Sequence, residues 1–224
     1  MIVRHGSTDW SAAGRFTGAA DVPLNAAGRA QAAATAGMLA GEPSLAGPIR
    51  VIASPLARAA ETAAIIAGAL GVGLAVEDGL REEGLGGWEG LTREEAARRF
   101  PGGYARWAAG DIGRFDGREG LEAVAARAVP ALLRHLGSPP GPMTGPASRP
   151  GLGACQEAPG GRGPAVVAVT HGNTALAIIG TLLGLPAGQW AELPFLPPGG
   201  ARVLDWGAGP AGGGWASSRP AAAP

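Results

Sequence analysis

Four basic residues stand just beyond the ends of short apolar runs and could together hold an anion. Arg4 and His5 follow the first run of the chain, and His171 follows a later one. Arg58 lies in the first turn of a helix expected after a third run. Arginine suits the paired oxygens of a phosphate, and an unprotonated imidazole is a competent covalent nucleophile. These residue types predict a phosphate pocket in which a histidine attacks phosphorus.

Two of these residues oppose the dipoles of the helices that they begin. Helices are expected to start near Pro55 and at Gly172, next to Arg58 and His171. A helix N-terminus is already the positive end of the helix dipole, so the added positive charge is relieved when an anion binds there. Each residue taken alone would be an ordinary hydrogen-bonded or solvated side chain. The prediction therefore depends on the repetition of the pattern.

Phosphoryl transfer from an ester also needs a proton donor for the leaving oxygen. The segment GLREEGLGGWEGLT, residues 79–92, offers Glu82, Glu83 and Glu89. A solvated loop would explain the same three carboxylates. The residues by themselves leave the choice among the three open.

The composition excludes several other chemistries. Arginine supplies all 18 basic side chains, which excludes a P-loop lysine and a lysine Schiff base. The three histidines, at positions 5, 135 and 171, have no metal-ligand spacing, and no Cys-x-x-Cys pair occurs. We therefore expect no metal and no organic cofactor.

Length, charge and cysteine content bound the class of protein. A chain of 224 residues with 46% hydrophobic residues fits one domain with a sizeable core. The net charge is zero, so we expect no nucleic-acid partner. No apolar run is long enough to cross a membrane, and no signal peptide is indicated. The single cysteine, Cys155, suits a reducing cytoplasm.

Apolar runs alternate with helical patterns along the chain. This alternation predicts an α/β fold, a three-layer sandwich with a mostly parallel central sheet. Ligands of such sheets bind beyond the carboxyl ends of the strands. We expect the first strand to be central, flanked by the strands that deliver Arg58 and His171. The expected strands are 2–3, 49–54, 74–79, 165–170 and 201–206, the last at an edge, and the expected helices are 25–41, 55–71, 91–100, 120–137 and 171–185.

Two Gly/Pro-rich segments lack the pattern of a core element. Residues 138–164 have no apolar periodicity and predict a disordered surface insertion. Residues 207–224 predict a flexible tail. The domain is therefore expected to span residues 1–206, including the insertion.

Four segments, taken in order, resemble the four signatures of the histidine phosphatase superfamily, also called the phosphoglycerate-mutase-like family. The resemblance covers about residues 1–206 without the insertion. The segments are RHG at 4–6, SPLARAAET at 54–62, LREEGLGGWEG at 80–90 and THGNT at 170–174.

The resemblance implies a role for each matching residue. His5 would be the nucleophile that becomes phosphohistidine, and Arg4, Arg58 and His171 would clamp the phosphoryl oxygens. Glu82, which matches the acid of the family, would protonate the leaving oxygen and then deprotonate the attacking water. The neighbouring cations should lower the pKa of His5. Further phosphate contacts are expected from Ser11, Thr17, Gly18 and Gly172.

The third signature separates mutases from phosphatases. Mutases of the family typically carry Arg-Glu-Arg-His-Tyr-Gly there, with lysines nearby, whereas residues 85–92 read LGGWEGLT. This segment resembles the phosphatase branch, which includes α-ribazole phosphatases and glucosyl-3-phosphoglycerate phosphatases. Residues 116–129 also resemble a segment of that branch, with Glu119 in place and Gly120 where serine is usual. We expect a histidine acid-type phosphatase acting on a small phosphorylated metabolite, with a phosphoglycerate mutase, a non-catalytic phospho-ligand binder and a homodimer left open.

The chain departs from the family at two positions near the nucleophile. Ser11 stands where asparagine usually helps to hold phosphate, and Ser7 stands where glutamate or glutamine is frequent. A serine hydroxyl has a shorter reach than these side chains. The departures put phosphate affinity and substrate class in question, and the sequence does not indicate which substrate is used.

Overall fold

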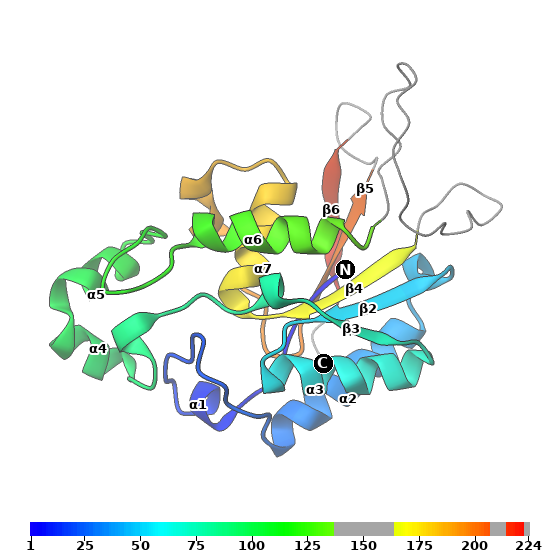
Figure 1. The fold of residues 1–224 in the computed structure, drawn as a ribbon, viewed down its shortest axis with the longest axis horizontal. Helices are drawn as coiled ribbons and strands as arrows, with labels where there is room; N and C mark the ends of the chain where they lie inside the picture. Colours follow the sequence, from blue (N-terminus) through cyan, green and yellow to red (C-terminus); the bar gives the residue numbers. More distant parts are fainter. Residues whose placement is uncertain (137–163, 207–213, 222–224) are drawn as a thin grey trace.

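The computed structural model, which describes residues 1–136, 164–206 and 214–221, is built around a six-stranded sheet (Figure 1). The strand order is β3-β2-β4-β1-β5-β6. The pairs β1–β4, β2–β4 and β2–β3 are parallel, whereas β5 runs antiparallel to both β1 and β6. The strands are β1 (Ile2–Arg4), β2 (Ile49–Ala53), β3 (Leu74–Val76), β4 (Ala165–Thr170), β5 (Ala201–Trp206) and β6 (Trp215–Ala221).

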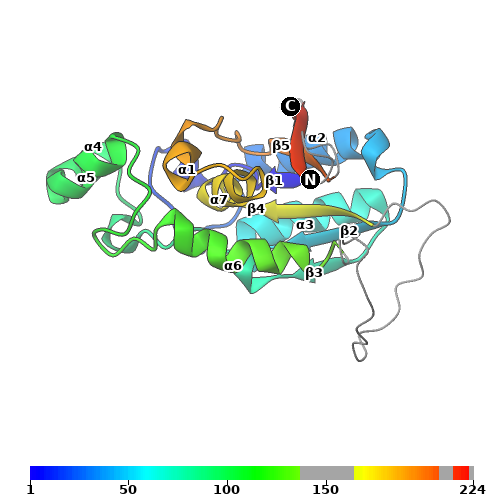
Figure 2. The same ribbon diagram turned by 90° about the horizontal axis from the view of Figure 1, so that it is seen from above.

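Helices cover both faces of the sheet, so the predicted three-layer α/β fold is confirmed. Figures 1 and 2 place α2 and α3 on one face and α6 and α7 on the other, with α4 and α5 projecting beyond one end. The helices are α1 (Asp9–Ala12), α2 (Ala26–Ala40), α3 (Ala57–Leu70), α4 (Arg93–Arg99), α5 (Pro101–Ala108), α6 (Leu121–Leu133) and α7 (Gly172–Leu182). Short 3₁₀ turns join them at η1 (Pro43–Leu45), η2 (Asp78–Leu80), η3 (Gly86–Trp88) and η4 (Ala187–Glu192).

The period of two along β4 explains why both faces are apolar. Val167 and Val169 pack into the core under α2 and α3, whereas Val166 and Ala168 pack under α6 and α7. Successive side chains of a strand point to opposite faces, and a parallel strand covered on both sides is therefore apolar throughout. The continuous apolar run AVVAVT therefore supplies side chains to the cores on both faces of the sheet.

Two sequence-based expectations about the sheet are wrong. β4 lies between β1 and β2, so β1 is flanked by β4 and β5 and not by the strand that precedes Arg58. β5 is not at an edge, because residues 215–221, expected to belong to a flexible tail, form β6 and pair with it. Trp215 packs against the core beside α6 and α7, which gives this segment an apolar anchor. The expected insertion lies outside the described residues, except Pro164.

Candidate active site

The carboxyl ends of β1, β4 and β2 meet at one edge of the sheet and deliver the predicted residues. His5 follows β1, His171 follows β4, and Ser54 follows β2, just before the helix that carries Arg58. All four side chains are buried, and the rings of the two histidines lie 5.0 Å apart, edge to face. The predicted convergence of His5, Arg58 and His171 is therefore present in the fold.

The hydrogen bonds of His5 define which ring nitrogen can attack. Nδ1 lies 2.6 Å from the carbonyl oxygen of Gly6, and Nε2 accepts a hydrogen bond from Nε of Arg58 at 3.1 Å. Nδ1 must therefore carry the proton, which leaves the lone pair on Nε2. Burial lowers the pKa of His5 well below 6.5, and the charges of Arg58 and Arg4 lower it further. The imidazole is thus neutral, as a nucleophile requires.

The guanidinium of Arg58 is held by a turn that precedes α2. It donates to the carbonyl oxygen of Gly18 at 2.8 Å and to that of Ala20 at 2.7 Å. Gly18 has a φ of 56°, in the left-handed region that favours glycine. Thr17 lies in the same turn and accepts the N–H of Ala20 through its carbonyl. The structure thus brings the Gly18 carbonyl to Arg58, where the sequence predicted a phosphate contact from this residue.

Ser11, another predicted phosphate ligand, has its hydroxyl engaged elsewhere. The hydroxyl accepts the N–H of Thr8 at 2.9 Å and donates to the carbonyl of Thr8 at 3.0 Å. The backbone N–H of Ser11 in turn donates to the Thr8 hydroxyl, which completes a capping box at the start of α1. In this structure Ser11 fixes the loop that follows His5.

Arg4 and His171 each keep one buried nitrogen without a hydrogen-bond partner among the described residues. Arg4 donates through one terminal nitrogen to the carbonyl of Leu196 at 2.7 Å, but its Nε is unpaired. His171 contacts the Ser54 hydroxyl through Nε2 at 2.8 Å, but its Nδ1 is unpaired. Buried donors are nearly always satisfied in proteins. Nε of Arg4 is thus an unsatisfied donor in a cationic pocket, which fits a bound anion, and Nδ1 of His171 is a second donor there when the Ser54 hydroxyl donates to Nε2.

Burial acts on the charges of both residues. It lowers the pKa of Arg4, although the Glu82 carboxylate opposes this shift. It lowers the pKa of His171 well below 6.5, and the charge of Arg58 adds to the effect. The pocket therefore combines two guanidinium cations with two neutral imidazoles and the carboxylate of Glu82. That balance favours an anion such as a phosphate.

The three candidate carboxylates have different partners, and only Glu82 lies at the start of α7 and acts on both arginines of the pocket. Glu82 accepts the backbone N–H groups of Thr174 at 3.1 Å and Asn173 at 3.3 Å, together with the Thr174 hydroxyl at 3.1 Å. It also raises the pKa of Arg4 and of Arg58 against the effect of burial. The anion at this helix N-terminus is thus Glu82 itself, next to the predicted Gly172.

Glu83 and Glu89 are structural in this arrangement. Glu83 is fully buried, forms a two-pronged ion pair with Arg118 at 2.9 and 3.1 Å, and accepts the Asn173 amide at 2.7 Å. Burial raises the pKa of Glu83. Glu89 accepts the backbone N–H groups of Ala19 at 2.9 Å and Leu85 at 3.0 Å. The geometry therefore favours Glu82 over both as the proton donor.

The aromatic residues of the segment after Trp88 pack mainly on one another. Trp88 is fully buried, and the rings of Phe16, Phe100, Tyr104, Trp107 and Phe115 surround it. This cluster is the core of the projection that carries α4 and α5. Core packing is therefore the main role of these rings.

Sequence reasoning missed two residues that border the pocket. Asp21 accepts the backbone N–H of Ala57 at 2.7 Å and so caps α3 from a distant loop. Phe195, half exposed, lies with its ring 4.8 Å from the Arg4 guanidinium and against Gly172. Both contacts join segments far apart in the chain, and no local pattern in the sequence marks them.

Comparisons with known proteins show the family to which this chain is related. The family model described as the histidine phosphatase superfamily (branch 1) matches residues 1–144. A glucosyl-3-phosphoglycerate phosphatase of Mycobacterium tuberculosis is 32% identical over 206 residues, which cover 92% of this chain and 82% of that protein. A probable phosphoglycerate mutase, GpmB, of Salmonella paratyphi C is 33% identical over 199 residues, covering 85% of this chain and 76% of that protein.

A solved structure extends the similarity to three dimensions. The structure of a mycobacterial glucosyl-3-phosphoglycerate phosphatase with VO3 superimposes with a TM-score of 0.77 at 27% identity, covering 97% of this chain and 95% of that one. Within residues 1–136, 164–206 and 214–221, no helix is long and apolar enough to cross a membrane.

Proposed function

Because this chain belongs to the histidine phosphatase superfamily and is one of its phosphoric monoester hydrolases, we propose that it hydrolyses its substrate through a phosphohistidine on His5. The observation that carries the proposal is the neutral imidazole of His5. Its unprotonated Nε2 lies against the Arg58 guanidinium, within a pocket that holds a second arginine and a carboxylate. Neutral nucleophile, anion clamp and proton donor are the three parts that the reaction needs.

The first half of the reaction forms the covalent intermediate. Nε2 of His5 donates its lone pair to phosphorus while the bond from phosphorus to the ester oxygen breaks. Glu82, protonated at this stage, gives its proton to the departing oxygen, and the alcohol leaves. Arg4, Arg58 and His171 hold the phosphoryl oxygens and stabilise their negative charge.

The second half returns the enzyme to its resting state. Glu82, now a carboxylate, removes a proton from water as the water oxygen attacks phosphorus. The phosphorus–nitrogen bond breaks, its electron pair returns to Nε2 of His5, and phosphate leaves. Glu82 is then protonated again, so no metal or organic cofactor enters the cycle that we propose.

Two alternatives from the sequence are weaker. A phosphoglycerate mutase of this family would be expected to use lysines near the third signature, and this chain has none. A non-catalytic binder would be expected to lack the nucleophile or the acid, whereas His5 and Glu82 are both in place. A relative with the name of a probable mutase nevertheless makes mutase activity worth measuring.

We propose a small phosphomonoester in the cytoplasm as the substrate. The names of the relatives make glucosyl-3-phosphoglycerate the first compound to assay, within a panel of phosphorylated sugars and acids. The single phosphate of such a compound fits a pocket in which we find two arginines and few other cations.

The nucleophile is tested by trapping the intermediate in acid after incubation with a phosphate-labelled substrate. Wild type should carry label on His5, and His5→Ala should carry none and lack turnover. Hydrolysis by wild type with no covalent phosphate would contradict the mechanism. Binding of phosphate without turnover would favour the binder, and exchange of 3- with 2-phosphoglycerate, primed by the bisphosphate, would favour the mutase.

A further inference from the structure

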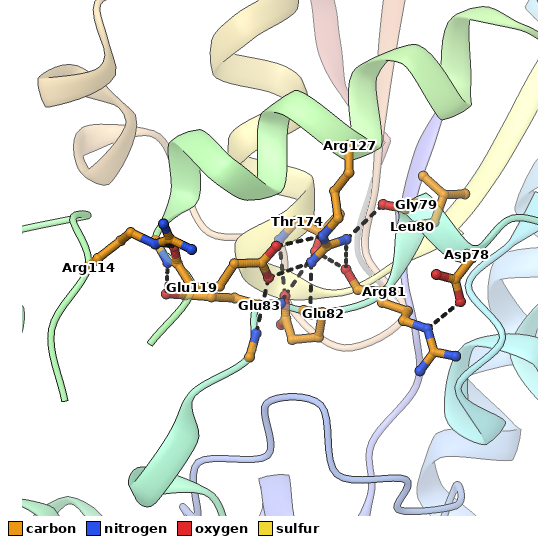
Figure 3. Close-up of polar contacts among 12 residues, drawn as sticks. Asp78, Gly79, Leu80, Arg81, Glu82, Glu83, Arg114, Glu119, Arg127 and Thr174 are labelled. Carbon is orange, nitrogen blue, oxygen red and sulfur yellow. Dashed lines mark hydrogen bonds and ion pairs between the residues drawn. The ribbon is translucent and has the colours of Figure 1, made fainter. Parts of the chain in front are cut away.

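Arg127, on α6, donates hydrogen bonds through every N–H group of its guanidinium. The acceptors are backbone carbonyls of the segment that carries Glu82 and the Glu119 carboxylate. Arg127 donates to the carbonyl oxygens of Gly79 at 2.8 Å, Arg81 at 2.8 Å and Glu82 at 3.0 Å. Its two remaining N–H groups meet the Glu119 carboxylate at 2.7 and 2.8 Å (Figure 3). All five donors of the planar fork are therefore used.

Glu119 forms hydrogen bonds with the same segment at Gly84, on the C-terminal side of Glu82. The backbone N–H of Glu119 donates to the carbonyl of Gly84 at 2.8 Å, and the N–H of Gly84 donates to the Glu119 carboxylate at 3.3 Å. Hydrogen bonds from Arg127 lower the pKa of Glu119, so its carboxylate stays charged near neutral pH. The pair thus fixes backbone atoms on both sides of Glu82.

α6 also packs directly against this segment. The backbone at Gly79 lies so close to α6 that an added Cβ would meet Arg127 and Ala131 at 2.7 Å. The 3₁₀ turn η2 therefore sits on the helix, and the chain that leaves η2 passes beneath the Arg127 guanidinium (Figure 3). The α7 N-terminus holds the Glu82 carboxyl, while α6 holds its backbone.

We propose that Arg127 and Glu119 form a clamp that positions Glu82 for proton transfer, without touching the substrate themselves. The inference rests on the proposed role of Glu82 as acid and base. Proton transfer needs the acid within hydrogen-bond reach of the leaving oxygen, and a shift of about 1 Å can cost roughly 100-fold in rate. A backbone held at three carbonyls leaves little room for such a shift.

A purely electrostatic role for Arg127 predicts a different result. Arg127 is a cation near the pocket, and its charge contributes to the lowered pKa of His171. Lysine would preserve that charge but has only three donors and no planar fork. Arg127→Lys therefore distinguishes the two roles, because it keeps the positive charge but loses most of the hydrogen bonds that position Glu82.

The test compares two substrates that need an acid to different degrees. p-Nitrophenyl phosphate has a good leaving group that departs without much help, whereas an alkyl phosphate, the best one from the substrate panel, needs the proton. The quantity measured is kcat/KM, because it covers the steps up to release of the alcohol. The variants are Arg127→Lys, Arg127→Gln, Glu119→Gln and Glu82→Gln, each checked for folding by its thermal unfolding.

We expect kcat/KM of both Arg127 variants to fall by up to about 100-fold on the alkyl phosphate, with KM little changed. On p-nitrophenyl phosphate the fall in kcat/KM should be much smaller. Glu119→Gln, which keeps one acceptor for Arg127, should show a smaller loss of the same kind. Arg127→Gln added to Glu82→Gln should lower the rate little further. Arg134→Gln is the matched control, because Arg134 also lies next to α6 and pairs with Glu77 just before η2.

Two results would overturn the clamp. One is equal loss on both substrates together with reduced stability, which indicates a structural role only. The other is wild-type activity in Arg127→Lys, which indicates a role of charge only. If Glu82→Gln itself fails to discriminate between the substrates, the proposed role of Glu82 is wrong, and that outcome is distinct from failure of the clamp alone.

Discussion

At the scale of single residues, the pocket keeps His5 and His171 neutral at a cost in acid stability. Burial and the neighbouring arginines lower the pKa of both well below 6.5. In the unfolded chain each histidine takes up a proton near pH 6.5, whereas in the folded chain it does not. The unfolded state therefore binds more protons below pH 6.5, and the free energy of unfolding falls as the pH falls.

We therefore expect wild type to lose stability from about pH 6.5 downward, with each histidine contributing up to about 1.4 kcal/mol per pH unit. Denaturant unfolding at a series of pH values between neutral and mildly acidic measures this slope. His171→Gln cannot titrate, so its free energy of unfolding should fall less steeply with pH than that of wild type. Parallel slopes for the two proteins would show that His171 is protonated in the folded state.

At the scale of elements, α2 docks unusually closely on the loop that follows His5. A Cβ added at Gly28 would overlap the backbone of Ser7, and one added at Gly6 would overlap the Gly28 carbonyl. Only glycine fits at these two positions, because the neighbouring atoms belong to the backbone and cannot move aside. The N-terminus of α2 therefore supports the loop that carries the nucleophile.

Gly28→Ala should push α2 away from this loop. We expect a loss of about 1–3 kcal/mol in the free energy of unfolding and a lower kcat/KM, because His5 would move with the loop. Gly37→Ala is the matched control on the same helix, where an added Cβ meets nothing within 4 Å. That variant should gain about 0.5–1 kcal/mol and keep full activity. Equal effects of the two substitutions would show that the close approach has no role.

The elements also show where sequence reasoning reached its limit. Apolar runs and caps predicted β1, β2, β4 and the helices α2, α3, α4, α6 and α7, because these signals are local, whereas the short helices α1 and α5 were not predicted. The place of β4 between β1 and β2 depends on pairing between distant segments, which no local pattern records. The same holds for the assignment of Glu82 as the proton donor. Glu83 is set aside on physical grounds because it forms an ion pair with Arg118, a contact between distant segments. The sequence therefore predicted which residue types lie together in the site, whereas their hydrogen-bond and ion-pair partners depend on the three-dimensional fold.

At the scale of the whole molecule, the length of β4 separates Pro164, the last residue of the expected insertion, from His171. β4 runs from Ala165 to Thr170, and His171 leaves its carboxyl end. Six residues of strand span roughly 20 Å at about 3.3 Å per residue. The chain that precedes Ala165 therefore enters β4 at the end opposite the pocket.

We accordingly expect that residues 138–163 can be replaced by a flexible Gly/Ser linker with kcat/KM retained. The reason is that Arg4, His5, Arg58 and Glu82 are supported by β1, α3, α6 and α7, and among the described residues their side chains form no hydrogen bond with the N-terminal end of β4. The comparison is steady-state hydrolysis by the two proteins, with thermal unfolding to confirm that the shortened chain is folded. A folded variant that has lost activity would place part of the insertion at the pocket and contradict the separation that β4 imposes.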